Sequence, residues 1–302
     1  MFKVLKTKMK MNKNLLGAAS CLFAAAAFTA CGGSQQKSNA DEQAAEAAPT
    51  TVELNVSEMP QGEENKTLTL PIDSEGYITI FDGKSLDGWR GYGMSAVPAR
   101  WTIEDGCLKF NGTGTGEGQQ AGGGDIVFAH KFKNFELSFE YKISKGGNSG
   151  VLYLAQEVPS KEKEGAWEPI YISAPEYQVL DNENHPDAKL GKDHNRQAAS
   201  LYDMIPANPQ NAKPAGEWNE GKIMVYKGTV VHSQNGENVV EYHLWTPQWT
   251  EMLQASKFSE EKWPLAFELL NNLGGDNHEG LIGLQDHGDD VWYRNIKIKV
   301  LD

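Results

Sequence analysis

The stretch Phe135–Ile143, FELSFEYKI, carries the clearest structural signal in the chain. Apolar side chains at every second position alternate with Glu, Ser, Glu and Lys. A period of two residues is typical of a β-strand with one buried face and one face turned to solvent or to a ligand. The stretch therefore predicts a strand of a sheet that covers a hydrophobic core on one side.

Similar runs recur from Pro71 to the end of the chain: YITIF, WTIEDGCLKF, SGVLYLAQ, EYQVL, KIMVYKGTVVHSQNGENVVEYHLW, GLIGLQ and VWYRNIKIKVL. Turn-forming pairs such as Asp105-Gly106 and Asn235-Gly236 separate them. Helical stretches are expected only at TEMLQAS and after Trp263. Many short strands without βαβ alternation predict one all-β domain over residues 71–302, a jelly-roll β-sandwich with one or two short helices.

The N-terminal segment 1–30 has a different composition. It contains an apolar run from Leu15 to Phe28, no acidic residue, and the basic residues Lys3, Lys6, Lys8, Lys10 and Lys13. This pattern predicts a secretory signal peptide whose apolar part is too short to span a membrane as a helix. The small residues before Cys31 in FTAC resemble a bacterial lipoprotein box, in which that cysteine is lipidated; the alternative is ordinary cleavage with an idle cysteine.

The expected product is an exported protein held by a lipid on Cys31 at a bacterial membrane, periplasmic or at the cell surface. Residues 31–70 are expected to form a flexible acidic tether, to which TVELNV and TLTL add at most two short edge strands.

Removal of residues 1–30 changes the formal charge from −13 to −18, which disfavours a nucleic-acid partner. Membrane contact is expected only through the lipid. Cys107 has no cysteine partner left for an intramolecular disulfide and is expected to be a small buried residue.

Strand parity sorts the polar side chains of three segments. In EYQVL, Tyr177 and Val179 are expected in the core, so Glu176 and Gln178 point to the opposite face. In NSGVLYL and GLIGLQDH, the core positions are Val151, Tyr153, Ile282 and Leu284, and the opposite face receives Asn148, Gly150, Gly283, Gln285 and His287. Polar groups beside small glycines fit a sugar-sized cleft over the sheet.

Plainer interpretations stand beside this one. Glu176 and Gln178 suit an ordinary solvent face, and His287 beside Asp286 suits a hydrogen-bonded turn. Arg294 shares parity with Ile296 and Ile298, as expected for a partly buried arginine paired with an acid. A tryptophan of such a sandwich either stacks on a bound sugar or, more commonly, packs in the core. Both interpretations are open for Trp89, Trp101, Trp167 and Trp292.

The segment DNENHPDAKLGKDHNR suits a solvated loop or a cation site built on Asp181, Asp187 or Asp193, but it lacks the spacing of a calcium-binding loop. The histidines are too scattered to define a metal site by spacing: His185, His194, His278 and His287. The sequence therefore requires no cofactor and leaves a divalent cation open.

Six segments occur in an order that resembles the 3-keto-disaccharide hydrolase family: FDGKSLDGW, NFELSFEYKI…GGNSGV, EYQVLDNENHPDA, SLYDMIPANPQNAKPAGEWN, VHSQNGENVVEYHLW and GLIGLQDHGDDVWYRNIKIK. The resemblance covers about Ile78 to Val300 and implies a concanavalin-like jelly roll that acts in exported glycan breakdown. It also implies a set of functional positions: Asn148, Glu176, Gln178, Asp181, Tyr202, Asn219, His232, Gln285, His287 and Arg294. One departure is Leu154, at a position where many members carry an arginine.

The implied substrate is a 3-keto-glycoside. A ketone at C3 acidifies the proton on C2, so a base can remove that proton, the C1 substituent can leave, and water can add. His287 is the candidate base and Glu176 the candidate acid, with these roles exchangeable; Asn148, Gln178, Gln285 and Arg294 are candidate donors to the enolate or to hydroxyls. The remaining implied positions are candidate substrate contacts.

Two rival functions remain open from the sequence. A conventional glycoside hydrolase needs two carboxyl groups, and Glu176 and Asp181 have opposite strand parity. A lectin-like module would bind carbohydrate on the same face without catalysis. The oligomeric state is not readable from the sequence.

Overall fold

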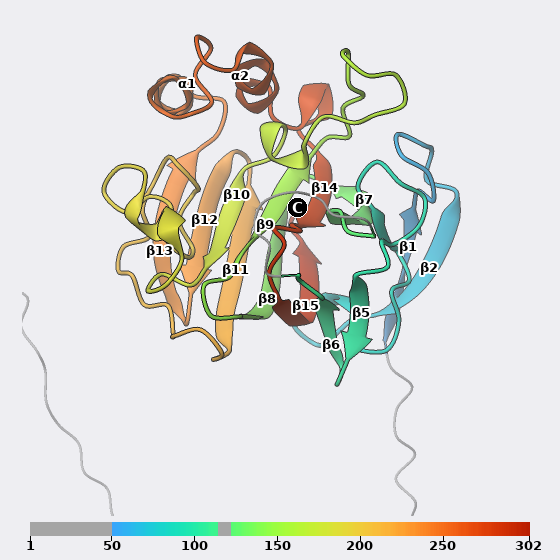
Figure 1. Cartoon of the computed structure of the whole chain (residues 1–302). Helices are drawn as coiled ribbons and strands as arrows, with labels where there is room; N and C mark the ends of the chain where they lie inside the picture. The colour runs from blue at the N-terminus through green and yellow to red at the C-terminus, as the bar shows by residue number, and fades with distance from the viewer. Residues whose placement is uncertain (1–49, 114–121) are drawn as a thin grey trace, which may run out of the picture. The chain divides into compact units, whose positions relative to one another are not determined.

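The computed structural model describes residues 50–113 and 122–302 and shows two large β-sheets (Figure 1). The eight-stranded sheet has the order β13-β12-β11-β8-β15-β6-β5, with β3 also paired to β15. Its strands are β3 (Ile78–Phe81), β5 (Trp101–Glu104), β6 (Cys107–Phe110), β8 (Phe135–Ile143), β11 (Asn219–Tyr226), β12 (Thr229–Gln234), β13 (Glu237–His243) and β15 (Val291–Val300). The five-stranded sheet, β10-β9-β14-β7-β4, contains β4 (Trp89–Gly91), β7 (Ile126–Phe132), β9 (Asn148–Ala155), β10 (Glu176–Leu180) and β14 (Gly280–Leu284). All of the strand pairs are antiparallel, and the predicted all-β jelly-roll sandwich is confirmed.

The core lies between the two sheets. In β8 the alternation works as predicted, because every second residue from Phe135 to Ile143 is buried and the residues between them are partly exposed. Phe139 of β8 meets Tyr177 of β10 edge to face, with ring centroids 5.3 Å apart. This aromatic contact joins the two sheets and adds directional packing to the burial of apolar area.

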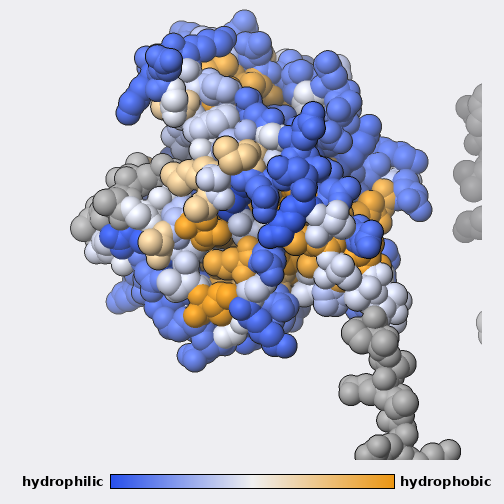
Figure 2. Space-filling view, turned by 90° about the vertical axis from the view of Figure 1, so that its right-hand side faces the viewer, coloured by the Kyte–Doolittle hydropathy of each residue, from blue (hydrophilic) through white to orange (hydrophobic). Residues whose placement is uncertain are grey.

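The segment expected as a tether is partly folded. Thr51–Val56 (β1) and Lys66–Pro71 (β2) pair as a two-stranded sheet, as suggested for TVELNV and TLTL. Leu54, Val56 and Leu68 join the main hydrophobic core. The flexible tether therefore does not reach residue 70, because apolar residues at alternate positions of these strands gain stability by burial. The face on the side of β1 and β2 is mostly hydrophilic, with a band of hydrophobic residues across its middle (Figure 2).

Two α-helices, α1 (Pro247–Ala255) and α2 (Pro264–Asn271), occur in the described part of the chain where helical stretches were predicted. Both begin with proline, whose missing N–H is tolerated in the first turn. Thr246 caps α1 by accepting a hydrogen bond from the Trp249 amide at 3.2 Å. Among the described residues, none of the helices has the length and apolar character needed to cross a membrane.

Several N-terminal predictions concern residues outside the described ranges. These are the signal peptide over 1–30, the lipidation site at Cys31, and the tether up to residue 49. They stay predictions. Cys107 is buried and free, as expected for a structural thiol, and burial raises its pKa.

Candidate active site

A cleft of about 780 Å³ opens on the side of the five-stranded sheet that faces away from the core. The core-facing residues of β9, β10 and β14 are those that parity predicted: Val151, Tyr153, Tyr177, Val179, Ile282 and Leu284. The cleft side receives residues from β9, β10 and the segment after β14. Six of the ten implied functional residues line it: Asn148, Glu176, Gln178, Tyr202, Gln285 and His287. Its volume suits a small saccharide.

Gly150 and Gly283, the two glycines expected to leave room over the sheet, make room for different side chains. A Cβ atom at Gly150 would lie 2.2 Å from Oε1 of Glu176, so the missing side chain gives the glutamate its place. These residues lie on the neighbouring strands β9 and β10, where Gly150 pairs with Gln178. A Cβ at Gly283 would lie 2.7 Å from Cδ1 of Ile170. Gly283 therefore makes room for an apolar side chain of the wall and not for a ligand.

The Glu176 carboxyl is held largely out of water, with the residue 8% exposed. Burial raises its pKa to about 8; Lys257 lowers it, while Asp125 and Asp187 raise it further. The side chain is therefore mostly protonated at neutral pH. A neutral carboxylic acid in a cleft can donate its proton to a leaving group.

His287 lies at the same cleft, beside Asn148. The Asn148 Nδ2 lies 3.1 Å from the imidazole Nε2, and because an amide nitrogen only donates, Nε2 is the acceptor in this arrangement. The Asp286 carboxylate accepts the amides of Gly124 at 2.7 Å and Gly288 at 2.9 Å, so it fixes the backbone of this segment. In this arrangement the Nε2 lone pair is engaged by Asn148, and it can accept a proton when that hydrogen bond breaks.

Two amide oxygens of the site are buried and have no hydrogen-bond partner among the described residues: Asn148 Oδ1 and Gln285 Oε1. A buried oxygen without a donor costs free energy, on the order of 1–3 kcal/mol. Hydroxyl groups of a bound sugar would satisfy both atoms.

Gln178 and Tyr202 line the cleft but are already engaged. Gln178 is fully buried, and its Oε1 accepts the Val179 amide at 3.1 Å. The Tyr202 hydroxyl donates to Asp187 Oδ2 at 2.9 Å. Arg196 also donates to Asp187, at 2.8 Å, so this loop forms a rigid wall of the cleft.

Two residues that the resemblance implies as functional, Asp181 and Arg294, make structural contacts outside the cleft lining. The Asp181 carboxylate accepts the amide of Gly146 at 2.7 Å and the side chain of Asn184 at 2.7 Å, and it lies outside the cleft lining. Arg294 donates to Glu140 at 2.6 and 2.9 Å from the outer face of the larger sheet. Its guanidinium lies 3.9 Å from the Trp218 ring centroid. Arg294 is therefore paired with an acid, as the structural alternative expected.

Asn219 and His232 also lie away from the cleft lining. Asn219 Oδ1 accepts the Lys213 amide at 2.7 Å. His232 is fully buried between the sheets, with Nε2 2.7 Å from the Tyr153 hydroxyl and Nδ1 2.9 Å from the Ala199 carbonyl oxygen. Burial lowers its pKa to about 4, so this histidine is a neutral part of the core.

The structure adds cleft residues that sequence reasoning missed, chiefly Lys257 and Asp125. Lys257 follows α1 in the segment ASKFS, where no strand period is available as a signal. Asp125 Oδ1 accepts the Asp286 amide at 2.8 Å. Of the four tryptophans considered as sugar platforms, Trp167 lines the cleft, whereas Trp89 and Trp101 are buried in the core.

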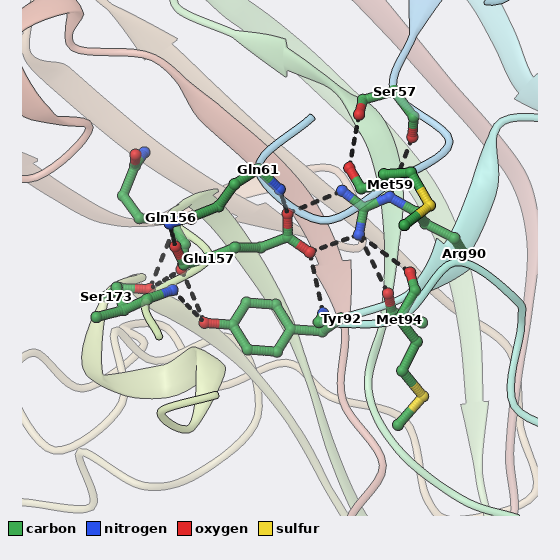
Figure 3. A network of polar contacts seen from close by, with 12 residues as sticks. Ser57, Met59, Gln61, Arg90, Tyr92, Met94, Gln156, Glu157 and Ser173 are labelled. Carbon is green, nitrogen blue, oxygen red and sulfur yellow. Dashed lines mark hydrogen bonds and ion pairs between the residues drawn. The ribbon is translucent and has the colours of Figure 1, made fainter. Parts of the chain in front are cut away.

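Tyr92–Met94 form one wall of the cleft, and the buried ion pair of Arg90 and Glu157 makes hydrogen bonds to this segment (Figure 3). Arg90 binds the Glu157 carboxylate through two nitrogens, at 2.5 and 2.9 Å, and both side chains are 4% exposed. Glu157 also accepts the Gly93 amide at 3.0 Å, and Arg90 Nη1 donates to the Met94 carbonyl at 3.4 Å. The pair therefore joins β4 to the loop that follows β9.

Three side chains near the cleft have the chemistry of a metal site. The ligand atoms of His185, His287 and Asp289 all lie within 4.8 Å of one another. Two imidazoles and a carboxylate suit a divalent transition metal. However, His185 Nδ1 accepts the Asp187 amide at 3.1 Å, which in a neutral ring leaves the proton on Nε2.

A β-sandwich whose smaller sheet carries a sugar-sized polar cleft is typical of proteins that act on or bind carbohydrate. Residues 76–299 match the family described as the 3-keto-alpha-glucoside-1,2-lyase-like domain, and the chain belongs to this family. This confirms the resemblance and the expectation of an enzyme rather than a binding module.

Similar proteins agree in sequence and in fold. A Bacteroides thetaiotaomicron protein named 3-keto-disaccharide hydrolase is 67% identical over 285 residues, which cover 94% of this chain and 97% of the relative. A crystal structure of a "putative glycosyl hydrolase" from Parabacteroides distasonis superposes with a TM-score of 0.59 at 28% identity, covering 76% of this chain and 95% of that one. A second structure from the same organism, with the same description, has a TM-score of 0.53 at 25% identity and covers 74% and 99%.

Proposed function

We propose that this enzyme cleaves 3-keto-glycosides, with 3-keto-disaccharides as the substrate class. The relative with 67% identity is named for this activity. The proposed route is removal of the C2 proton, elimination of the C1 substituent and addition of water, which gives net hydrolysis.

His287 is the proposed base and Glu176 the proposed acid. The imidazole takes the proton from C2, and the electron pair of the broken C–H bond moves toward the C3 carbonyl. As the C1–O bond breaks, the Glu176 carboxyl transfers its proton to the departing oxygen. The buried oxygens of Asn148 and Gln285 accept hydrogen bonds from ring hydroxyls and orient the sugar.

The observation that carries this proposal is that Glu176 and His287 share one cleft and that Glu176 is mostly neutral at pH 7. A conventional glycosidase instead places two carboxyl groups on either side of the bond. The cleft carboxylates Asp125 and Asp286 are committed to backbone amides. Glu168 is the remaining acidic group in the described lining that could pair with Glu176.

The deciding experiment compares a 3-keto disaccharide with its unoxidised parent in D2O. Cleavage of only the keto sugar, with deuterium entering at C2, supports elimination. Cleavage of both sugars with hydrogen retained at C2 supports the conventional mechanism. Binding of both without turnover contradicts either form of catalysis.

The reaction as proposed requires no cofactor. A divalent cation on His185, His287 and Asp289 would polarise the C3 carbonyl but would occupy a ring nitrogen of the proposed base. Overnight treatment with EDTA is expected to leave cleavage unchanged, and loss of activity with recovery on adding Mn²⁺ or Zn²⁺ would assign these three residues to a metal instead.

We also propose that the chain is exported and anchored through a lipid on Cys31. The support is the sequence before that cysteine, FTAC, and the basic and apolar segments that precede it. In cells fed a radiolabelled fatty acid, the wild-type protein should carry the label and the Cys31→Ala variant should not. Label on both proteins would exclude Cys31 as the lipidated residue.

A further inference from the structure

Lys257 is a basic residue at the cleft that takes no part in the proposed proton transfers. It lines the same cavity as Glu176 and His287. Its Nζ lies over the ring of Tyr202, 4.4 Å from the centroid, and within 5.0 Å and 5.5 Å of the ring centroids of Phe258 and Tyr171. Its backbone amide donates to Asp203 Oδ2 at 2.7 Å, which fixes the start of the side chain. Aromatic faces around an amine favour its positively charged form.

Among the residues that the structure describes, none forms a direct ion pair with Lys257. Within the described ranges, no carboxylate oxygen forms a salt bridge with its Nζ, whereas Arg196 is paired with both Asp187 and Asp203. Burial lowers the pKa of Lys257, and the nearby Glu176 and Asp203 raise it. A lysine in such a position can still form a strong hydrogen bond with an anion that appears during the reaction.

The proposed reaction needs such a partner. When C2 loses its proton, negative charge develops on the C3 oxygen, and an enzyme must stabilise that charge in the transition state. The buried unpartnered atoms of Asn148 and Gln285 are oxygens, which only accept hydrogen bonds, and the amide nitrogen of Gln285 is a donor without charge. Arg294, the other cationic candidate, lies on the outer face of the opposite sheet, paired with Glu140.

We propose that Lys257 is a further catalytic residue, whose ammonium group donates a hydrogen bond to the C3 oxygen as the enolate forms. This inference rests on the proposed 3-keto substrate. The C2–H bond breaks, the proton passes to His287, and its electron pair becomes the C2–C3 double bond while the carbonyl electrons move to the oxygen. Lys257 keeps its proton and forms no covalent bond to the sugar.

The test separates the enolate step from the departure of the C1 group. The 3-keto derivative of 1,5-anhydroglucitol has no glycosidic substituent at C1, so it can exchange its C2 proton with D2O but has no glycosidic bond to cleave. Exchange is followed by NMR, and cleavage of a 3-keto disaccharide is measured in parallel. Lys257→Met keeps the length of the apolar stem and removes the charge; Lys257→Arg keeps the charge.

We expect Lys257→Met to slow exchange and cleavage together by about 100-fold or more, as for loss of an oxyanion donor, and Lys257→Arg to recover part of both rates. Lys109→Met is the matched control, because Lys109 also lies over an aromatic ring, 5.1 Å from the Trp292 centroid, but outside the cleft. Its rates should equal those of the wild type. Melting temperatures verify folding, and Lys257→Gln replaces the methionine variant if that variant does not fold.

Two results would overturn the role of Lys257. One is a Lys257→Met enzyme that exchanges the C2 proton normally while cleavage is slow, because the lysine would then act on the leaving group. The other is a sugar adduct on Lys257 after borohydride treatment of the wild-type enzyme with the keto sugar, because this would show an imine. A wild-type enzyme that neither exchanges nor cleaves would overturn the proposed function itself, together with this inference.

Discussion

The Glu176 side chain occupies the space that a side chain at Gly150 would fill, with Oε1 only 2.2 Å from the position of a Cβ atom there. Gly150→Ala must therefore displace the carboxyl group. A shift of about 1 Å in a catalytic group can cost about 100-fold in rate. We expect kcat to fall 10- to 100-fold while the melting temperature changes little. An unchanged kcat would show that the position of Glu176 is not important for turnover.

Loss of the Glu176 proton should matter most for poor leaving groups. Glu176→Gln has nearly the same shape but cannot protonate the departing oxygen. We expect this variant to lose 100-fold or more in kcat on a 3-keto disaccharide and less than 10-fold on a nitrophenyl 3-keto-glucoside, whose phenolate leaves without help. Equal losses on the two substrates would remove Glu176 from the role of acid.

The raised pKa of Glu176 also has a consequence for stability. Its pKa is about 8 in the folded protein and near the ordinary 4.5 when unfolded. Between these values the folded state holds a proton that the unfolded state has released, so this group makes the free energy of unfolding decrease as pH rises from about 4.5 to 8, by up to about 1.4 kcal/mol per pH unit. Urea titrations should show a shallower decrease for Glu176→Gln. Parallel curves for the two proteins would contradict the shifted pKa.

The period of the strands made a large part of the architecture and of the cleft predictable. Alternation in β8, β9, β10 and β14 identified the core-facing residues, and the opposite parity brought Glu176 and Gln285 to one cleft. In β12, His232 has the same strand parity as the buried residues Val230 and Gln234, so the alternation itself indicates a buried histidine. The resemblance implied a functional position there, whereas the structure places this histidine in the core.

The alternation of a strand gives no guidance where the strand is irregular or where a segment is not a strand. The ladder between β15 and β8 shifts register between Arg294 and Lys297, and Asn295 adopts a positive φ of 52°. This irregularity turns Arg294 outward, although the sequence places it in step with the buried Ile296. Lys257 lies in a loop, so only the three-dimensional packing of α1 against the rest of the domain brings it to the cleft.

The buried ion pair of Arg90 and Glu157 supports the cleft wall, and its loss should affect both stability and substrate binding (Figure 3). In Arg90→Met, the carboxylate stays buried without its cation, which typically costs about 3–5 kcal/mol. Because Glu157 also holds the Gly93 amide, KM for the keto sugar should rise as the Tyr92–Met94 wall loosens. Urea unfolding and steady-state kinetics measure the two effects.

Arg294→Met is the control for this pair. Its guanidinium is paired with Glu140 on the surface, with the arginine side chain 39% exposed, and exposed ion pairs contribute only about 0–1 kcal/mol. The control should therefore lose little stability and keep its KM, since Arg294 lies outside the cleft lining. Equal destabilisation by the two substitutions would mean that burial does not set the strength of the Arg90–Glu157 pair. A normal KM in a folded Arg90→Met enzyme would show that the wall keeps its shape without the arginine.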